Sequence, residues 1–217
     1  MLDFADCRTR LNTALLSDVL DGMGWREQVL GRAIRPLDDG HVLAGRARTA
    51  LFMDIYEVVE GENPYAMEIA LIDSLKRDEI PVFACGASGR IAPWGELLST
   101  AAKVRGAAGA LMDGMVRDVR AIRGMGFPVF HGGIGPLDCK GRGKVAAIDV
   151  PVACAGVMVR PGDFIFGDAD GVIVVPQAVE ARAVTLALEK LSGERTTLAD
   201  LEAGVSLAEV FAKYGIL

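Results

Sequence analysis

The sequence predicts a single mixed α/β domain over residues 1–217, in which helices flank a β-rich core. Three observations carry this prediction. The chain has 217 residues, enough to bury a core without disulfides or structural metals. Helix-like and strand-like patterns alternate up to residue 130, which is typical of α/β proteins. From Lys144 to Pro176 the pattern changes to short strands separated by Pro and Gly turns. We find no repeat and no linker that would mark a domain boundary.

The first third of the chain reads as helix, strand and helix. Apolar residues at helical spacing predict a first helix over residues 12–23, which Gly22 and Gly24 stop. Turns with a short strand are expected over 31–45, and a buried strand over 47–56. Pro64 opens an amphipathic helix over 65–77. We predict that its buried stripe consists of Ala66, Ile69, Ala70, Ile72 and Leu75.

The middle and the end of the chain continue this alternation. A short strand over 80–86 runs into a glycine-containing loop, a helix follows over 96–106, and a strand follows over 107–114. A short helix should then end near Gly124 or Gly126, before a strand over 127–130. The tail from Gln177 returns to helix, with an amphipathic segment over 179–191 and a second helix over 199–211.

Composition narrows the class of protein. Hydrophobic residues make up 51% and charged residues 24%, the balance of a soluble globular chain. The net charge of −6 disfavours a general nucleic-acid surface. No apolar run approaches the roughly 18 residues of a membrane span, and Asp3 and Asp6 do not fit a signal peptide. The four cysteines form no CxxC pair, which favours reduced thiols. We therefore expect a cytoplasmic protein with neither nucleic acid nor membrane as partner.

Several common chemistries are excluded by motif. His41 and His131 are the only histidines, so the usual zinc layouts are absent, and no serine lies in GxSxG. Residues 168–171 resemble the start of a calcium loop, but Val179 stands where a bidentate Glu is required, and a tight turn between strands is the better interpretation. The basic run 140–144 suits either an anion or, more readily, a solvated glycine turn.

The stretch from Gly86 to Asp118 carries the remaining chemistry. Gly95, Glu96, Leu97 and Leu98 lie at a predicted helix start, where free backbone N–H groups suit a carboxylate or phosphate. Beyond residues 97–116, the pair Arg117-Asp118 follows a strand and opens the next helix. An aspartate there can bind a hard divalent cation, and the arginine can donate to a carbonyl or carboxylate. The residues alone leave open that Asp118 caps the helix and Arg117 is a surface charge.

Residues 95–130 and 138–176, and more weakly the first helix, resemble the RraA-like family. This family includes the class II, metal-dependent 4-hydroxy-4-methyl-2-oxoglutarate and 4-carboxy-4-hydroxy-2-oxoadipate aldolases. An acid followed at this spacing by Arg-Asp is typical of the aldolase branch, so the resemblance favours a metal-binding role for Asp118. It implies an α/β/β sandwich that assembles as a homotrimer or as a dimer of trimers, a homohexamer, with active sites between subunits.

The resemblance also implies roles for individual residues. Asp118 would be the direct ligand of Mg²⁺ or Mn²⁺, and Arg117 would bind the keto oxygen of the substrate and stabilise its enolate. The backbone of the turn from Gly95 to Leu98 would hold the pyruvate carboxylate, through Leu97 and Leu98. Glu96 would reach the metal through water, and Glu194 of a neighbouring subunit is a further candidate for such a contact.

The implied reaction is cleavage of a 4-hydroxy-2-oxo dicarboxylic acid to pyruvate and a second 2-oxo acid. Oxaloacetate decarboxylation should accompany it, because both reactions pass through a pyruvate enolate that a divalent cation and an arginine stabilise. Two positions depart from the family pattern: Ala121 stands where an acid is frequent, and Glu96 where aspartate is frequent. The alternative is a non-catalytic regulator of the RraA type, which binds and inhibits the endoribonuclease RNase E. Members of that branch generally lack the Arg-Asp pair, so Arg117-Asp118 favours the enzyme.

Overall fold

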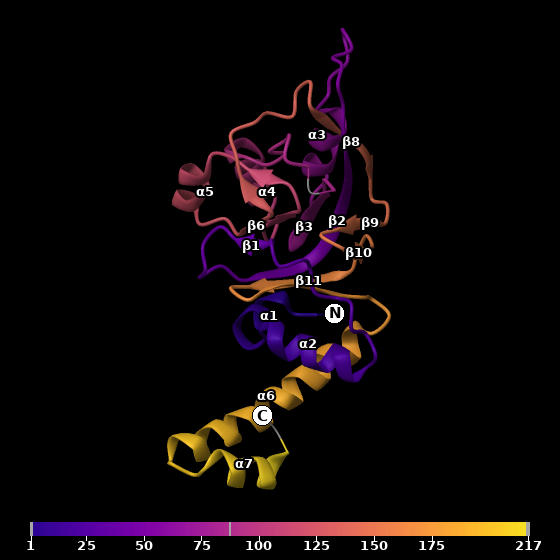
Figure 1. Ribbon diagram of the computed structural model, residues 1–217. Coiled ribbons are helices and arrows are strands. Elements are labelled where there is room, and N and C mark those ends of the chain that lie inside the picture. Colours follow the sequence, from indigo (N-terminus) through magenta and orange to yellow (C-terminus); the bar gives the residue numbers. More distant parts are fainter. Residues whose placement is uncertain (1, 87, 216–217) are drawn as a thin grey trace.

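A computed structural model describes residues 2–86 and 88–215, and it shows a β-rich core with helices on its outer faces (Figure 1). The helices are α1 (Phe4–Arg10), α2 (Thr13–Gly22), α3 (Ala66–Asp73), α4 (Glu96–Val104), α5 (Val119–Met125), α6 (Glu180–Glu202) and α7 (Leu207–Tyr214). The strands are β1 (Arg35–Pro36), β2 (Leu43–Asp54), β3 (Glu79–Ala84), β4 (Ala110–Met112), β5 (Met115–Val116), β6 (Val129–His131), β7 (Gly133–Ile134), β8 (Gly143–Ile148), β9 (Val152–Cys154), β10 (Val157–Val159), β11 (Phe164–Asp168) and β12 (Gly171–Val175). The predicted mixed α/β fold is confirmed.

The main sheet has eight strands and curls towards closure. Its order is β1-β6-β4-β3-β2-β11-β12, and β8 pairs with the far half of β2. Strands β6, β4, β3 and β2 run parallel, whereas β1, β8, β11 and β12 pair antiparallel. The two ends of this order, β1 and β12, contact one another, so the sheet is nearly a barrel. The pairs β9-β10 and β5-β7 form small additional sheets.

Both faces of this sheet are buried, which explains why its strands read as continuous apolar runs rather than as alternating ones. Side chains on the inner face pack in one cluster that the β9-β10 hairpin closes. Side chains on the outer face divide between two clusters, one beneath α3, α4 and α5 and the other against α1, α2 and α6. In β2, for example, Ala47 points inward, whereas Ala44 and Phe52 lie in the two outer clusters.

The first predicted helix is confirmed, and two details of other helices are corrected. Asn12 caps α2 by accepting a hydrogen bond from the backbone N–H of Leu15 at 2.8 Å. In α3 the predicted stripe is wrong in part: Ile72 and Leu75 are buried, but Ala66, Ile69 and Ala70 are exposed. Helix α3 begins after Tyr65 and buries the face that carries Glu68, Leu71 and Ile72. The predicted helix over 199–211 is interrupted, because α6 runs on to Glu202 and α7 begins at Leu207.

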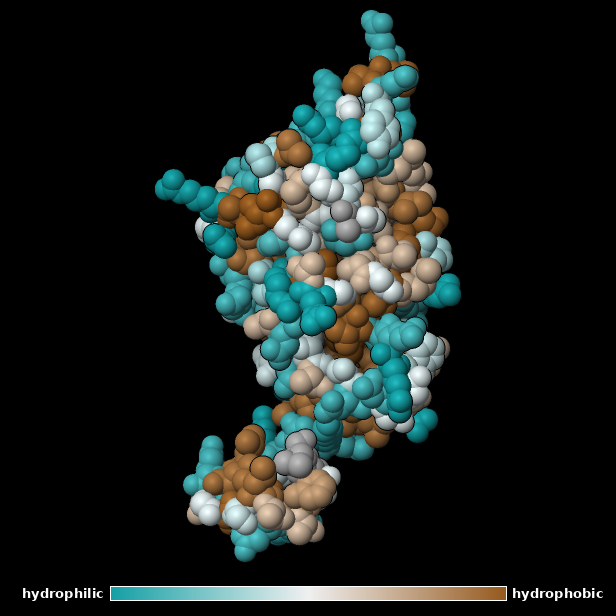
Figure 2. All heavy atoms as spheres, in the orientation of Figure 1, coloured by the Kyte–Doolittle hydropathy of each residue, from teal (hydrophilic) through white to brown (hydrophobic). Residues whose placement is uncertain are grey.

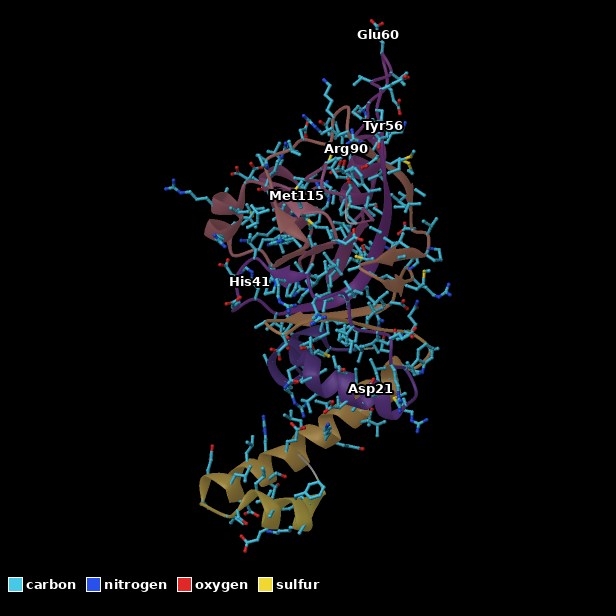
Figure 3. The ribbon with its side chains drawn as sticks, viewed as in Figure 1. Asp21, His41, Tyr56, Glu60, Arg90 and Met115 are labelled. Atoms are coloured by element: carbon cyan, nitrogen blue, oxygen red, sulfur yellow. The ribbon has the colours of Figure 1, made fainter. Side chains whose placement is uncertain are left out.

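Two segments project from the core at opposite ends (Figure 1). Helix α6 extends past α2 and carries α7 at its outer end, where hydrophobic side chains gather (Figure 2). The exposed apolar residues there are Leu198, Val205, Leu207 and Phe211. At the other end the chain between β2 and α3 projects, with Tyr56 near its base and Glu60 at its tip (Figure 3). The guanidinium of Arg90 lies 4.1 Å from the ring centre of Tyr56 and holds this base.

The two motifs that the sequence left between ligand binding and a turn, residues 168–171 and 140–144, form turns in the structure. The carboxylate of Asp168 accepts hydrogen bonds from the backbone and hydroxyl of Thr13, at 2.8 and 2.6 Å, so the Asp168–Gly171 segment is the tight β11-β12 turn that anchors α2. The run 140–144 is a turn into β8 whose Lys144 pairs with Glu62.

All four cysteines are free thiols and buried. Among the described residues, no helix combines the length and apolar composition needed to cross a bilayer.

Candidate active site

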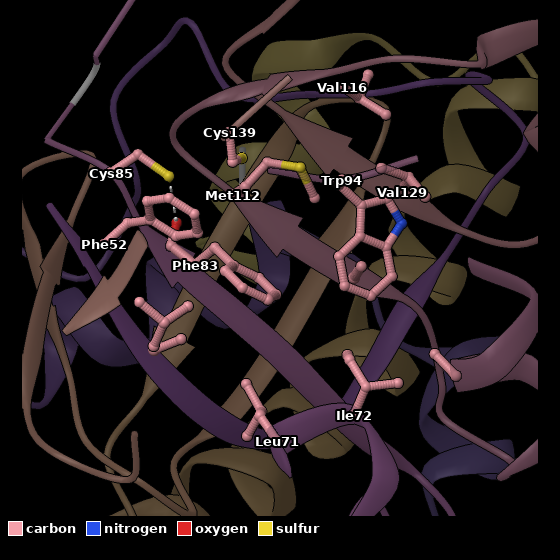
Figure 4. Packing of buried hydrophobic residues seen from close by; sticks show 14 of the residues in the cluster. Phe52, Leu71, Ile72, Phe83, Cys85, Trp94, Met112, Val116, Val129 and Cys139 are labelled. Carbon is pink, nitrogen blue, oxygen red and sulfur yellow. Dashed lines mark hydrogen bonds between the residues drawn. The ribbon is translucent and has the colours of Figure 1, made fainter. Parts of the chain in front are cut away.

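Two chain segments that the sequence singled out lie side by side at the starts of α4 and α5. Trp94 forms a parallel bridge with Val116, and the backbone N–H of Arg117 donates to the carbonyl of Trp94 at 2.9 Å. The indole of Trp94 is fully buried in the outer cluster beneath α3, α4 and α5 (Figure 4). It stacks with Phe127, and its Nε1 donates to Ser99 of α4 at 2.7 Å. Trp94 therefore fixes the start of α4 against the start of α5.

Asp118 has a conformation that favours a functional role over a capping role. Its backbone is left-handed, with φ 57° and ψ 31°, which costs a non-glycine residue on the order of 1 kcal/mol. It occupies the N-cap position of α5, but its side chain makes no capping hydrogen bond there. Instead Oδ2 accepts from the backbone N–H of Glu96 at 3.1 Å, and the side chain is 44% exposed. The alternative that Asp118 simply caps α5 is therefore wrong.

Gly95 is required where Asp118 approaches the start of α4. A Cβ built on Gly95 would lie 2.6 Å from Oδ2 of Asp118 and 3.2 Å from Cγ of Arg117. Real Cβ atoms essentially never approach a neighbour this closely, so any side chain at position 95 would displace the aspartate. The glycine thus permits the contact between the two helix starts.

The first turn of α4 presents free backbone donors. The N–H of Glu96 is bound to Asp118, and the first helical hydrogen bond is that from Ser99 to Gly95. Within residues 2–86 and 88–215, the N–H groups of Leu97 and Leu98 have no hydrogen-bond acceptor. Two such donors at a helix start, together with the helix dipole, suit the carboxylate of a small anion, as the sequence predicted.

Arg117 lies between two carboxylates. Its Nη1 is 3.1 Å from Oδ1 of Asp138, and its Nε is 3.8 Å from Oδ2 of Asp118. The side chain is 37% exposed, so the guanidinium keeps donors available to a ligand. The Asp138 pair orients it, because a guanidinium held by one carboxylate loses less freedom when it binds a second oxygen.

These groups line a cavity of about 480 Å³. The lining residues are Tyr65, Glu68, Ile69, Ala92, Pro93, Trp94, Gly95, Leu97, Leu98, Arg117, Asp118, Asp138 and Cys139. A second hollow, of about 370 Å³, lies on the other side of Arg117 and Asp118. The cavity is large enough for a small dicarboxylic acid.

The sequence interpretation missed a second wall of the cavity, which Tyr65, Glu68 and Asp138 form. The hydroxyl of Tyr65 donates to Oδ2 of Asp138 at 2.7 Å. Burial, and then this hydrogen bond, raise the pKa of Tyr65 to about 12. Burial opposes ionisation of Asp138, but the hydrogen bond from Tyr65 and the charge of Arg117 hold the pKa of Asp138 below its ordinary value.

Glu68 is the most perturbed carboxyl of this wall. It is 4% exposed, and burial, followed by the negative charge of Asp138, raises its pKa to about 7, while Arg117 opposes the shift. The signal that could have identified it is a charged residue on the side of α3 that carries Leu71 and Ile72. The predicted stripe of α3 includes Ile72 and Leu75 but not Glu68.

Glu194 does not belong to this cavity in its own subunit. It lies on α6, where its carboxylate is 3.8 Å from Nζ of Lys190. Helix α6 packs against α2 and α7, on the far side of the β11-β12 end of the sheet from α4 and α5 (Figure 1). A contact from Glu194 to Asp118 therefore requires a second copy of the chain, as the prediction stated.

The donor set suits a cation that keeps most of its water. Among the described residues, no group of three or more His, Cys, Asp or Glu side chains is arranged to hold a metal ion, so Asp118 would be a lone direct ligand. Oδ1 of Asp118 is free of hydrogen bonds within the described part of the chain. Mg²⁺ commonly binds through one or two carboxylates together with water and substrate oxygens. The oxygen-only chemistry at Asp118 fits Mg²⁺ or Mn²⁺ better than zinc.

The sequence matches a family model over residues 13–174, that of the RraA-like proteins, described as "Aldolase/RraA". The chain belongs to the RraA-like family. The matched segment contains all the site residues except Glu194. Among RraA-like relatives, a protein of Halalkalibacterium halodurans is 35% identical over 87% of this chain and 84% of its own. That relative carries the provisional name 4-hydroxy-4-methyl-2-oxoglutarate aldolase, which links this chain to the aldolases of the family.

Solved structures show the same RraA-like fold. An uncharacterised protein of Pseudomonas syringae superposes with a TM-score of 0.83, at 26% identity, over 95% of both chains. RraAS2 of Streptomyces coelicolor, described as an unusual member of the RNase ES inhibitor RraA protein family, superposes with a TM-score of 0.77 at 28% identity, over 87% of this chain and 91% of its own. One solved relative is thus described by an RNase inhibitor family, whereas the sequence relative of Halalkalibacterium halodurans is named as an aldolase.

Proposed function

We propose that this RraA-like protein is a divalent-metal-dependent aldolase. It cleaves 4-hydroxy-2-oxo dicarboxylic acids of the 4-hydroxy-4-methyl-2-oxoglutarate type to pyruvate and a second 2-oxo acid, and it decarboxylates oxaloacetate through the same enolate. The observation that carries the proposal is the convergence of three groups in one cavity: the free N–H groups of Leu97 and Leu98, the guanidinium of Arg117 and the strained Asp118.

Each group meets one part of a pyruvoyl unit. The N–H groups of Leu97 and Leu98 bind the carboxylate at the start of α4. Arg117 donates to the keto oxygen, where negative charge develops as the C–C bond breaks. Asp118 would hold Mg²⁺ or Mn²⁺, with Glu96 and a neighbour's Glu194 in contact through water. When bound, such a cation stabilises the developing enolate as a Lewis acid.

We further propose that the protein functions as a homotrimer or a dimer of trimers. Arg117 and Asp118 lie between two surface hollows, so a neighbouring subunit can complete the site from the open side. The apolar residues of the projecting α6-α7 arm, Leu198, Val205, Leu207 and Phe211, need a partner surface. Light scattering that gives a monomer mass at micromolar concentration contradicts this part of the proposal.

The second candidate is a non-catalytic regulator that binds a ribonuclease, and the structural similarity to RraAS2 favours it. A regulator that acts by surface binding has no need of a glycine that admits Asp118 to the start of α4, or of a left-handed aspartate. We therefore rank the aldolase first. Inhibition of RNase E by the purified protein, without any pyruvate release, would reverse this order.

A coupled pyruvate assay tests the proposal. The panel contains 4-hydroxy-4-methyl-2-oxoglutarate, 4-carboxy-4-hydroxy-2-oxoadipate and oxaloacetate, each with Mg²⁺ or Mn²⁺, with EDTA, and in a blank that has metal but no protein. We expect pyruvate release above the blank with at least one hydroxy acid and with oxaloacetate, and its loss with EDTA. Absence of release from the whole panel contradicts the proposed activity.

A further inference from the structure

Glu68 differs from the other buried acids of the described chain. Asp113, Asp163 and Glu68 are all buried. Asp113 accepts from the backbone of Cys85 and Ala155, and Asp163 accepts from the backbone of Arg160 and Gln177. Within residues 2–86 and 88–215, the carboxyl of Glu68 has neither a hydrogen-bond donor nor a cation within ion-pair distance. Unlike Nδ1 of His41 and of His131, which are buried without a partner, the carboxyl oxygens of Glu68 still reach the solvent of the cavity, so this free carboxyl is open to a ligand.

The surroundings of Glu68 point to a ligand. Its side chain lines the same cavity as Arg117 and Asp118. The neighbouring Asp138 is already engaged by Tyr65 and Arg117, which leaves Glu68 as the uncommitted carboxyl of that wall. Glu68 also lies on α3, which packs against α4, the helix whose start would hold the substrate carboxylate, and both line this cavity. A pyruvate unit bound at that helix start therefore lies in the same cavity as the Glu68 carboxyl.

We propose that Glu68 is the acid that protonates C3 of the pyruvate enolate, an inference that rests on the proposed function. In decarboxylation the C3–C4 bond of oxaloacetate breaks, CO₂ leaves, and the electron pair remains on the enolate. The neutral carboxyl of Glu68 gives its proton to C3, and the resulting carboxylate regains a proton from water. In aldol cleavage the proton lost by the C4 hydroxyl balances the proton gained at C3, so no net proton is consumed.

The charged and titratable groups around Glu68 agree with this role. They are Tyr65, Arg117, Asp138 and Cys139. The pKa of Tyr65 and that of Cys139 are both raised to about 12, and the pKa of Asp138 is lowered, so none of these three exchanges protons readily at neutral pH. The pKa of Glu68, raised to about 7 by burial and by Asp138, is matched to proton transfer near neutrality.

The test separates proton transfer from bond cleavage. Exchange of the pyruvate methyl protons for deuterium is followed by NMR in D₂O with Mg²⁺, and loss of oxaloacetate is followed separately, with a metal blank subtracted. In Glu68→Gln, which can neither remove a proton from C3 nor return one, we expect exchange to fall at least about 100-fold, the usual contribution of a general acid or base. Oxaloacetate loss should fall less than about fivefold, because the enolate can leave and take a proton from water. Glu60→Gln, the same change at an exposed tip, should leave both rates unchanged.

Each outcome decides the proposal. Undiminished exchange in Glu68→Gln overturns it, as does an equal fall of both rates, which indicates a structural role. If the wild type shows neither reaction with either metal, the proposed function itself fails. If Glu68→Gln does not fold, the pH profile decides: exchange begins when the Glu68 carboxylate removes a proton from C3, so wild-type exchange should rise as the pH rises through about 7, with a displaced midpoint in Glu68→Asp. A flat profile from pH 5 to 9 overturns the role.

Discussion

The two walls of the cavity are built on different principles. The wall at the starts of α4 and α5 is open, and it is organised by the backbone: Asp118 binds the N–H of Glu96, and Gly95 makes room for the contact. The wall on α3 is closed and organised by side chains, with Glu68 buried beside the Tyr65-Asp138 hydrogen bond. The first arrangement holds charges and backbone dipoles in fixed positions, whereas the second shifts the pKa of a carboxyl group.

This difference separates two demands of enolate chemistry. Stabilising the enolate needs donors and cations that do not move, which the wall at the starts of α4 and α5 supplies. Ending the reaction needs an acid whose pKa lies near the working pH, which a carboxyl reaches through burial and through a nearby negative charge. Variants of the two walls should therefore fail in different ways.

The largest effect should follow Asp118→Ala. Removal of the carboxylate removes the direct ligand of the metal, so metal-dependent pyruvate release should fall by about 1,000-fold or more. Stability should change little, because the side chain is nearly half exposed and the strained backbone remains. Coupled pyruvate assays with and without added Mn²⁺ measure this effect. Full activity in the variant means that Asp118 does not hold the metal.

Gly95→Ala should lower activity by displacing Asp118, without removing any charged group from the site. The added Cβ would lie 2.6 Å from Oδ2 of Asp118, so the aspartate must move, and we expect a loss of roughly 10- to 100-fold in kcat/KM for pyruvate release. Gly124→Ala is the matched control, since a Cβ there meets nothing within 4 Å and the residue lies within α5. The control should keep full activity, and its free energy of unfolding should rise by about 0.5–1 kcal/mol. Equal activity in the two variants contradicts the role of Gly95.

Glu68→Gln should change how stability depends on pH. The folded-state pKa of Glu68 is raised from 4.5 to about 7, so between these values the native state binds more protons than the unfolded state, and stability falls as the pH rises. The variant lacks this loss. The free energy of unfolding of the variant, minus that of the wild type, should therefore be about 2–3 kcal/mol larger at pH 8 than at pH 4. Urea unfolding at both pH values measures this, and an unchanged difference rules out a strongly shifted Glu68.

Ser99→Ala should have the smallest effect and should report on the support beneath the wall at the starts of α4 and α5. The variant leaves the buried Nε1 of Trp94 without its partner, which costs about 1–3 kcal/mol. Thr100→Ala, at an exposed position of the same helix, should cost less than about 0.5 kcal/mol. Thermal unfolding compares the two. If Ser99→Ala unfolds at the wild-type temperature, Trp94 does not depend on this hydrogen bond.

The wall at the starts of α4 and α5 could be predicted from the sequence because its signals are local. Glycine before an acid marks the start of α4, and Arg117-Asp118 marks the start of α5. The wall on α3 could not be predicted, because Glu68 and Asp138 meet only after α3 packs beside β8 and the sheet curls. In α3 nearly every position is apolar, so its periodicity fits more than one buried face, and tertiary packing selected the face with Glu68. The near closure of the sheet could not be predicted from the sequence either, because the contact of β1 with β12 depends on the twist of the sheet rather than on composition.

The central claim is that this cavity generates and stabilises a pyruvate enolate with a divalent cation. Deuterium exchange into the methyl group of pyruvate tests it most directly, because it requires enolate formation and no knowledge of the physiological hydroxy acid. We expect the wild-type protein to exchange the methyl protons in D₂O with Mg²⁺ or Mn²⁺, well above the rate of metal alone, and to lose this exchange with EDTA. Exchange at the blank rate, or exchange that EDTA leaves unchanged, contradicts the account.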